Sequence, residues 1–96
     1  MRERDVEKYF SRRVQELGGK SWKWSSPSQR GVPDRIAMFP GGKIIFAEIK
    51  RPGGVTSKLQ NYVGSTIILL GFEWVVLSSF EEIDNYFKIG GRHGYY

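Results

Sequence analysis

Hydrophobic residues recur at helical spacing in three parts of the chain, and each part is predicted to form a helix. The first helix runs from about Arg4 to Leu17 and ends at a pair of glycines. The second runs from about Ser57 to Leu70. The third is short, begins at a Ser-x-x-Glu capping box and ends near Lys88. The apolar stripes of the first two helices are formed by Val6, Phe10, Val14 and Leu17, and by Leu59, Val63, Thr66, Ile67 and Leu70.

Four shorter runs predict β-strands. Residues 21–25 alternate apolar with polar side chains, residues 73–77 are mostly apolar, and two runs that flank Pro40-Gly41-Gly42 indicate a β-hairpin. The hairpin carries Ile36, Met38, Ile44 and Phe46 on one face, and Ala37, Phe39, Ile45, Ala47 and Ile49 on the other. A sheet that is apolar on both faces is usually covered by helices on both. The order αβββαβα therefore predicts one layered α/β domain over residues 1–96, with an irregular tail from about Gly90.

Two acidic residues of the hairpin are predicted to face each other. If strand pairing is centred on Gly41, Asp34 lies directly opposite Glu48, with Cβ atoms about 5 Å apart. The two carboxylates would repel each other, and a hard cation such as Mg²⁺ bound between them would remove this repulsion. Lys50 lies on the same face, roughly 7 Å along the strand. A turn one residue shorter or longer would make the acid pair diagonal. The cluster is either a functional site or a salt-bridged sheet edge.

Other polar residues near this cluster each have two interpretations. Glu7 borders the buried stripe of the first helix and could lean toward the site, with Glu3 as a rival one turn earlier, but acids in a first turn are also ordinary. Gln60 could orient a metal-bound water, or it could only close the Ser57-x-x-Gln60 capping box. From the residues alone, the ordinary role is favoured for all of them.

The charge of the chain favours a polyanionic partner. Net charge is +5 and the isoelectric point is near 9.7, which makes nucleic acid the leading candidate. Trp22 and Trp24 could stack on bases, although alternating tryptophans in a small sheet are more typical of a core. The cationic residues that cluster in sequence around the acids, and that could contact phosphate, are Arg30, Arg35, Arg51 and Lys58.

Composition also excludes several classes of site. The chain has no cysteine, which excludes disulfides, zinc knuckles and thiol nucleophiles. Its single histidine, His93, argues against histidine metal sites and Ser-His-Asp triads. The charged N-terminus does not resemble a signal peptide, and the longest apolar stretch is too short to span a bilayer. We therefore expect a soluble, intracellular protein without a membrane partner.

Taken together, these motifs resemble the PD-(D/E)xK nuclease superfamily. More closely, they are similar to the virus-type replication-repair nuclease (VRR-NUC) domain, and the resemblance covers about Arg2 to Phe87. It is carried by Gly31-Val32-Pro33-Asp34-Arg35, by Glu48-Ile49-Lys50-x-Pro52-Gly53-Gly54, and by Gln60 in the following helix. The resemblance implies a restriction-endonuclease-like core of order αβββαβ(α), in which helices flank a central mixed sheet.

The resemblance also implies a chemistry. It predicts a Mg²⁺- or Mn²⁺-dependent DNA endonuclease in which Asp34, Glu48, Glu7 and the carbonyl of Ile49 bind metal. Lys50 would orient or deprotonate the attacking water or neutralise charge, and Gln60 would assist. The short stand-alone members of this family, from phages and bacteria, imply a cytoplasmic homodimer that cuts branched DNA such as four-way junctions. The alternatives are a general duplex nuclease with the same site and a non-catalytic DNA-binding module.

Overall fold

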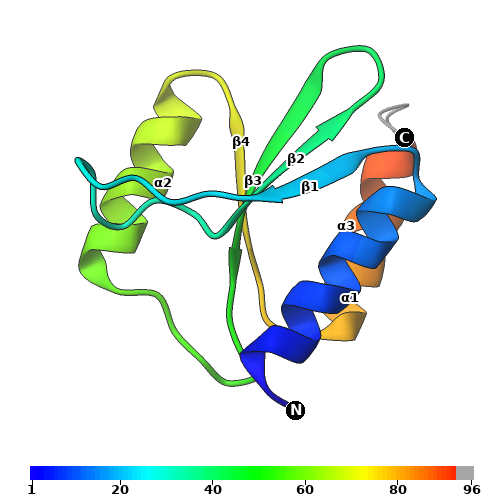
Figure 1. Cartoon of the computed structure of the whole chain (residues 1–96), viewed down its shortest axis with the longest axis horizontal. Helices are drawn as coiled ribbons and strands as arrows, with labels where there is room; N and C mark the ends of the chain where they lie inside the picture. The colour runs from blue at the N-terminus through cyan, green and yellow to red at the C-terminus, as the bar shows by residue number, and fades with distance from the viewer. Residues whose placement is uncertain (93–96) are drawn as a thin grey trace.

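The protein folds into a four-stranded sheet with helices on both faces (Figure 1). The computed structural model describes residues 1–92, with side chains described as far as Lys88. Helices α1 and α3 lie side by side on one face of the sheet and α2 lies on the other (Figure 1). In chain order the elements are α1 (Glu3–Glu16), β1 (Lys20–Lys23), β2 (Arg35–Phe39), β3 (Lys43–Ile49), α2 (Lys58–Leu69), β4 (Glu73–Leu77) and α3 (Phe80–Arg92). The predicted α/β order is confirmed.

The strand order β1-β2-β3-β4 gives a mixed sheet. The first three strands are antiparallel, and β4 runs parallel to β3 because α2 carries the chain back between them. In the hairpin, Arg35 pairs with Ala47 and Phe39 pairs with Lys43, so the pairing is centred on Gly41 as predicted. This register extends to Asp34 and Glu48, which therefore lie across from each other at the open end of the hairpin.

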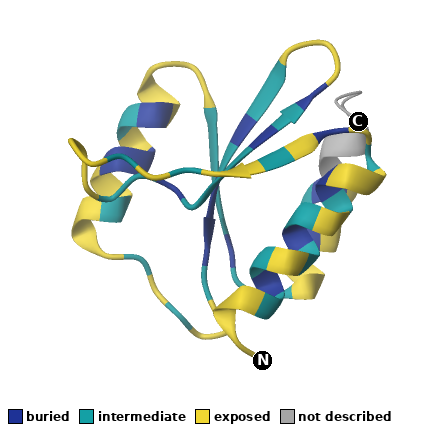
Figure 2. Ribbon diagram, viewed as in Figure 1, coloured by how far each residue is buried: buried dark blue, intermediate teal, exposed yellow. Residues whose placement is uncertain are grey.

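The main core lies between the sheet and the α1–α3 pair, where dark blue segments of both layers meet (Figure 2). Its members are Val6, Phe10, Val14, Ala37, Phe39, Ile45, Ala47, Ile49, Leu77, Ile83 and Phe87. The α2 face carries an aromatic cluster that includes Trp24, Phe46 and Phe72. Gly64 of α2 lies so close to Trp74 that a Cβ atom there would approach the indole ring to 2.2 Å. The helix can therefore pack closely on β4 only with glycine at this position.

The boundaries differ from the prediction mainly at the C-terminus. Helix α3 continues to Arg92 instead of ending near Lys88, so Gly90 and Gly91 are helical although an irregular tail was predicted. A glycine costs a helix only about 1 kcal/mol, and the costly nucleation of α3 is already complete before Gly90, so two glycines need not end the helix. The rest of the tail, with His93, lies outside the described residues. Within residues 1–92, no helix is long and apolar enough to cross a membrane.

Candidate active site

Asp34 directly precedes β2 and links three strands. Its backbone carbonyl accepts a hydrogen bond from the Trp24 N–H at 2.9 Å, which continues the pairing with β1. Its carboxylate Oδ2 accepts a hydrogen bond from the backbone N–H of Ile49 at 2.7 Å. The side chain therefore takes the place of a backbone acceptor at the end of the β2–β3 pairing. This arrangement fixes the Asp34 carboxylate at the end of β3, beside Glu48.

The loop before Asp34 is held against α2 by a glycine. Gly31 has φ +84°, and a Cβ atom there would lie 2.8 Å from Leu59 Cγ. Both the backbone conformation and the close approach therefore require glycine. Pro33, which follows, is fully buried. These contacts bring the Pro33-Asp34 segment toward the first turn of α2, which carries Gln60.

Glu48 is a buried acid whose two oxygens have different surroundings. Its side chain is only 2% exposed. Oε2 accepts a hydrogen bond from Gln60 Nε2 at 3.0 Å and lies 3.6 Å from Lys50 Nζ. Oε1 is buried and has no hydrogen-bond partner among the described residues. A buried oxygen without a donor is costly, so this atom is the point in the site that calls for a ligand.

The proximity of Asp34 makes this cost larger. Burial, the charge of Asp34 and a hydrogen bond with Asp34 raise the pKa of Glu48 to about 8, while Lys50 opposes the shift. When both carboxyl groups are ionised, neither can donate to the other, and Glu48 Oε1 is left unsatisfied. Two species can satisfy it: a proton shared with Asp34, or a cation between the two groups. The site therefore favours a positive charge next to Oε1.

Gln60 closes the predicted capping box and also contacts Glu48. Its backbone N–H donates to Ser57 Oγ at 3.1 Å, and its side-chain Oε1 accepts from the Ser57 backbone N–H at 2.9 Å, so the predicted capping box is present. Because Oε1 is used by the cap, the amide nitrogen is directed away from it, toward Glu48. The cap thus sets the orientation in which Gln60 donates to the acid.

Glu7 of α1 forms ion pairs with two cations of the sheet and not with the acid pair. Its Oε2 accepts from Arg35 Nε at 2.8 Å and lies 3.3 Å from Lys23 Nζ. Its rival Glu3 is exposed in the first turn of α1. Within residues 1–92, no three His, Cys, Asp or Glu side chains approach closely enough to hold one metal ion together. The structure therefore brings Asp34, Glu48, Lys50 and Gln60 together, but it does not add Glu7 to them.

The acid pair nevertheless fits a divalent cation. Asp34 and Glu48 supply hard oxygen donors, and Glu48 Oε1 is buried with no hydrogen-bond partner in the described part of the chain. Mg²⁺ is commonly held by one or two carboxylates and keeps several waters, so a third protein acid is not required. The donor set suits Mg²⁺ or Mn²⁺ and does not suit softer metals, which prefer sulfur or imidazole.

The cationic residues named from the sequence are not equivalent. Arg30, Arg51 and Lys58 are exposed and available to an anionic partner. Arg35 is engaged by Glu7, and its side chain is only 21% exposed. The sequence reasoning underestimated Trp22, which is 64% exposed. The exposure of Trp22 could have been expected from its place in an edge strand, because such a strand has a neighbour on one side only.

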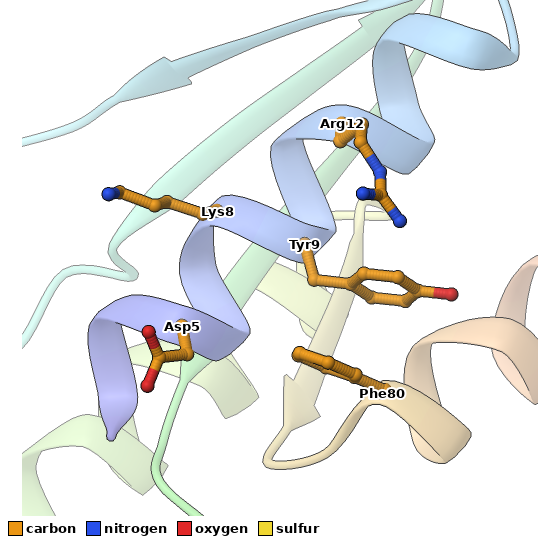
Figure 3. A pocket seen from close by; sticks show the side chains of 5 residues that line it. All are labelled: Asp5, Lys8, Tyr9, Arg12 and Phe80. Atoms are coloured by element: carbon orange, nitrogen blue, oxygen red, sulfur yellow. The ribbon is translucent and has the colours of Figure 1, made fainter. Parts of the chain in front are cut away.

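A separate hollow of about 460 Å³ lies between α1 and the start of α3 (Figure 3). It is lined by Asp5, Lys8, Tyr9, Arg12 and Phe80. The ring of Tyr9 stacks on that of Phe80 at 4.2 Å between centroids, and the Arg12 guanidinium lies 4.9 Å from the Tyr9 centroid (Figure 3). None of these side chains belongs to the acid cluster, so the hollow is distinct from the candidate active site.

Two known proteins are similar to the chain over most of its length. "Putative nuclease p44" of Acyrthosiphon pisum secondary endosymbiont phage 1 is 40% identical over 79 residues, which is 82% of this chain and 85% of the phage protein. A solved structure named "VRR_NUC domain" superimposes with a TM-score of 0.85 at 29% identity, covering 90% of this chain and 94% of that one. No family model matches the sequence. The fold, the relative and the structural neighbour agree: the chain belongs to the VRR-NUC family of nuclease domains.

Proposed function

We propose that this nuclease domain is a metal-dependent endonuclease that hydrolyses phosphodiester bonds in DNA. The observation that carries the proposal is Glu48 Oε1, a buried acceptor without a donor among the described residues, on an acid that interacts with Asp34. Lys50 and Gln60 both approach Oε2, so the ion pair of a purely structural sheet edge does not account for Oε1. A purely DNA-binding module would also gain nothing from two juxtaposed carboxylates, since they repel phosphate.

The residues around the acid pair have separable roles in this proposal. A divalent ion bound by Asp34 and Glu48 would lower the pKa of a bound water and stabilise charge on the phosphate. Gln60 holds Oε2 of Glu48, which fixes the orientation of the carboxylate and leaves Oε1 for the metal. Lys50 is close enough to Glu48 to be positioned by it, and its ammonium can orient the attacking water or neutralise charge on the phosphate.

Further residues complete the proposed site. We assign the Ile49 carbonyl as an additional metal ligand. Ile49 directly follows Glu48, and its N–H donates to Asp34, so its backbone lies beside both acids. Glu7 could join only after its ion pairs with Arg35 and Lys23 open, so Asp34 and Glu48 carry the metal. Arg30, Arg51 and Lys58 are exposed cations that can contact the DNA backbone.

We further propose that the protein acts as a homodimer on branched DNA, such as a four-way junction. An exposed apolar surface at the end of α2 supports a second copy as partner: Ile68 is 52% exposed, Leu69 85%, Leu70 71% and Phe72 48%. A two-fold dimer would present two equivalent sites, as paired incision of a junction requires. The phage relative supports action in the cytoplasm of a bacterial cell.

The test compares cleavage of a labelled four-way junction with cleavage of a linear duplex of the same sequence, in Mg²⁺, Mn²⁺ or EDTA. We expect metal-dependent cutting of the junction that is lost in Lys50→Ala and Asp34→Asn. Asparagine is preferred to alanine because an amide oxygen can still accept from Ile49 N–H. Equal cutting of both substrates would indicate a general duplex nuclease, and binding without cutting in any metal would indicate a DNA-binding module.

A further inference from the structure

We infer that Trp22 is a base-stacking residue, which contacts an unpaired nucleobase of DNA bound at the acid cluster. The inference rests on the proposed nuclease function and adds to it a residue that selects the substrate. It concerns the sheet face that carries Asp34 and Glu48, where α2 covers only part of the surface.

Sheet register places Trp22 next to the acids. Trp22 pairs with Ile36 in the adjacent strand β2, and Asp34 is two residues before Ile36. Because alternate residues share a face, Trp22, Ile36 and Asp34 lie on the same side of the sheet. The strand rise and strand spacing put the Cα atoms of Trp22 and Asp34 roughly 8 Å apart. That separation is about two base steps of a DNA strand.

Trp22 is not part of the core. Its side chain is 64% exposed, whereas Trp24 packs against Phe46 with ring centroids 5.5 Å apart. Leaving an indole in water on an edge strand costs free energy, and aromatic residues exposed in this way are typical of binding surfaces. Trp22 therefore has an exposed aromatic ring that the core does not use.

The charges around Trp22 favour nucleic acid as its partner. Lys20 is exposed and lies on the same face, two residues earlier along β1. Lys23 lies on the opposite face and pairs with Glu7, so it does not add to the charge beside Trp22. The only acids that the described sheet places on this face are Asp34 and Glu48. An exposed aromatic ring beside basic residues is an arrangement by which proteins hold a nucleobase and its phosphates.

A second copy of the chain is a poorer partner for this edge. In a two-fold interface the same surface meets itself, so the exposed lysines of β1 would face each other and repel. The exposed end of α2 is apolar and offers a better contact between copies. Duplex bases are stacked and paired, so Trp22 can reach a base only where the helix is opened, as at a branch point or a single-stranded end.

The experiment compares Trp22→Ala and Trp22→Phe with wild type, and uses Tyr62→Ala as a control for an aromatic that is similarly exposed, at 67%, but lies on α2. Binding of a four-way junction, a single strand and a linear duplex is measured in EDTA by fluorescence anisotropy, and cleavage is measured in Mg²⁺. Trp22→Ala should lose roughly tenfold or more in affinity for the junction and the single strand, and much less for the duplex. Trp22→Phe should retain most of the affinity, and Tyr62→Ala all of it.

A second readout does not depend on cleavage. The fluorescence of the exposed Trp22 indole should be quenched when a single strand binds, and this quenching should disappear in Trp22→Phe although binding persists. Equal junction affinity of Trp22→Ala and wild type would overturn the inference, as would conversion of a dimer to a monomer by Trp22→Ala. If wild type binds none of the DNAs, the proposed function itself fails, so the two failures are distinguishable.

Discussion

Gln60 donates a hydrogen bond from its amide nitrogen to Glu48 Oε2 at 3.0 Å, while its amide oxygen caps helix α2. One side chain therefore joins the start of a helix to a buried acid of the sheet. The cap fixes the amide, the amide fixes one carboxylate oxygen, and the other oxygen stays buried without a donor among the described residues. The stability of α2 and the geometry of the candidate active site are thus coupled through Gln60.

Two variants of this cap distinguish its effect on stability from its effect on cleavage. Ser57→Ala removes the oxygen that accepts from Gln60 N–H and should cost about 1 kcal/mol of stability. It leaves the Ser57 backbone N–H to orient the amide, so cleavage should be nearly unchanged. Gln60→Ala should cost a similar amount of stability but should reduce cleavage at least tenfold, because Glu48 loses its donor. Thermal melting and junction cleavage test both, and equal activity of the two variants would contradict the positioning role.

Glu48 should make stability depend on pH in the absence of metal. Its pKa is raised from an ordinary 4.5 to about 8, so the folded protein keeps a proton that the unfolded chain releases. The stabilisation by this proton is complete below about pH 4.5 and is lost as the pH rises toward 8. The total loss of stability is on the order of a few kcal/mol. Melting temperatures in EDTA at pH 5 and pH 8.5 should show this fall, and Mg²⁺ should reverse it at pH 8.5.

Glu48→Gln is the matched control for that measurement. The amide has the shape of the acid but does not titrate, so the difference in melting temperature between the variant and wild type isolates Glu48 from every other titrating group. We expect the variant to be more stable than wild type at pH 8.5 in EDTA and to gain nothing from Mg²⁺. Parallel pH profiles for the two proteins would show that Glu48 is not the titrating group.

Gly31 should be much less replaceable than Gly41, although both have a positive φ. Gly31 has φ +84° and faces Leu59, whereas Gly41 has φ +90° and nothing within 4 Å of its Cβ position. Alanine at Gly41 should cost only the strain of the left-handed backbone, about 1–2 kcal/mol. Alanine at Gly31 should cost more stability, because its Cβ would also press against Leu59. It should reduce cleavage as well, because the loop that carries Asp34 would be displaced from α2. Denaturant unfolding of both variants measures the difference, and equal losses would argue against this contact.

Glu7 provides a test of which acids carry the metal. In the structure it pairs with Arg35 and Lys23, away from Glu48. The rise in melting temperature on adding Mg²⁺ should therefore persist in Glu7→Gln and vanish in Glu48→Gln. If Glu7→Gln also abolishes the rise, the ion pairs open on metal binding and Glu7 is a ligand.

Local structure and hairpin register were predictable from the residue pattern alone. Period-2 and period-3.6 patterns predicted the helices and strands, since burying one face of an element requires that spacing. The Pro-Gly-Gly turn predicted which residue faces which, and so placed Asp34 opposite Glu48 before any contact was known. The resemblance of Gly31-Val32-Pro33-Asp34 and Glu48-Ile49-Lys50 to the VRR-NUC family then predicted the fold, which the structural neighbour confirms.

The contacts between side chains from distant parts of the sequence depend on how the helices and strands pack together. This packing gave Gln60 two roles at once, directed Glu7 to Arg35, left Glu48 Oε1 without a partner among the described residues and exposed Trp22. None of these follows from residue spacing, because each depends on which neighbour lies across a helix–sheet contact or beyond the last strand. Periodicity specifies the face on which a side chain lies, and the packing of the elements specifies what it meets there.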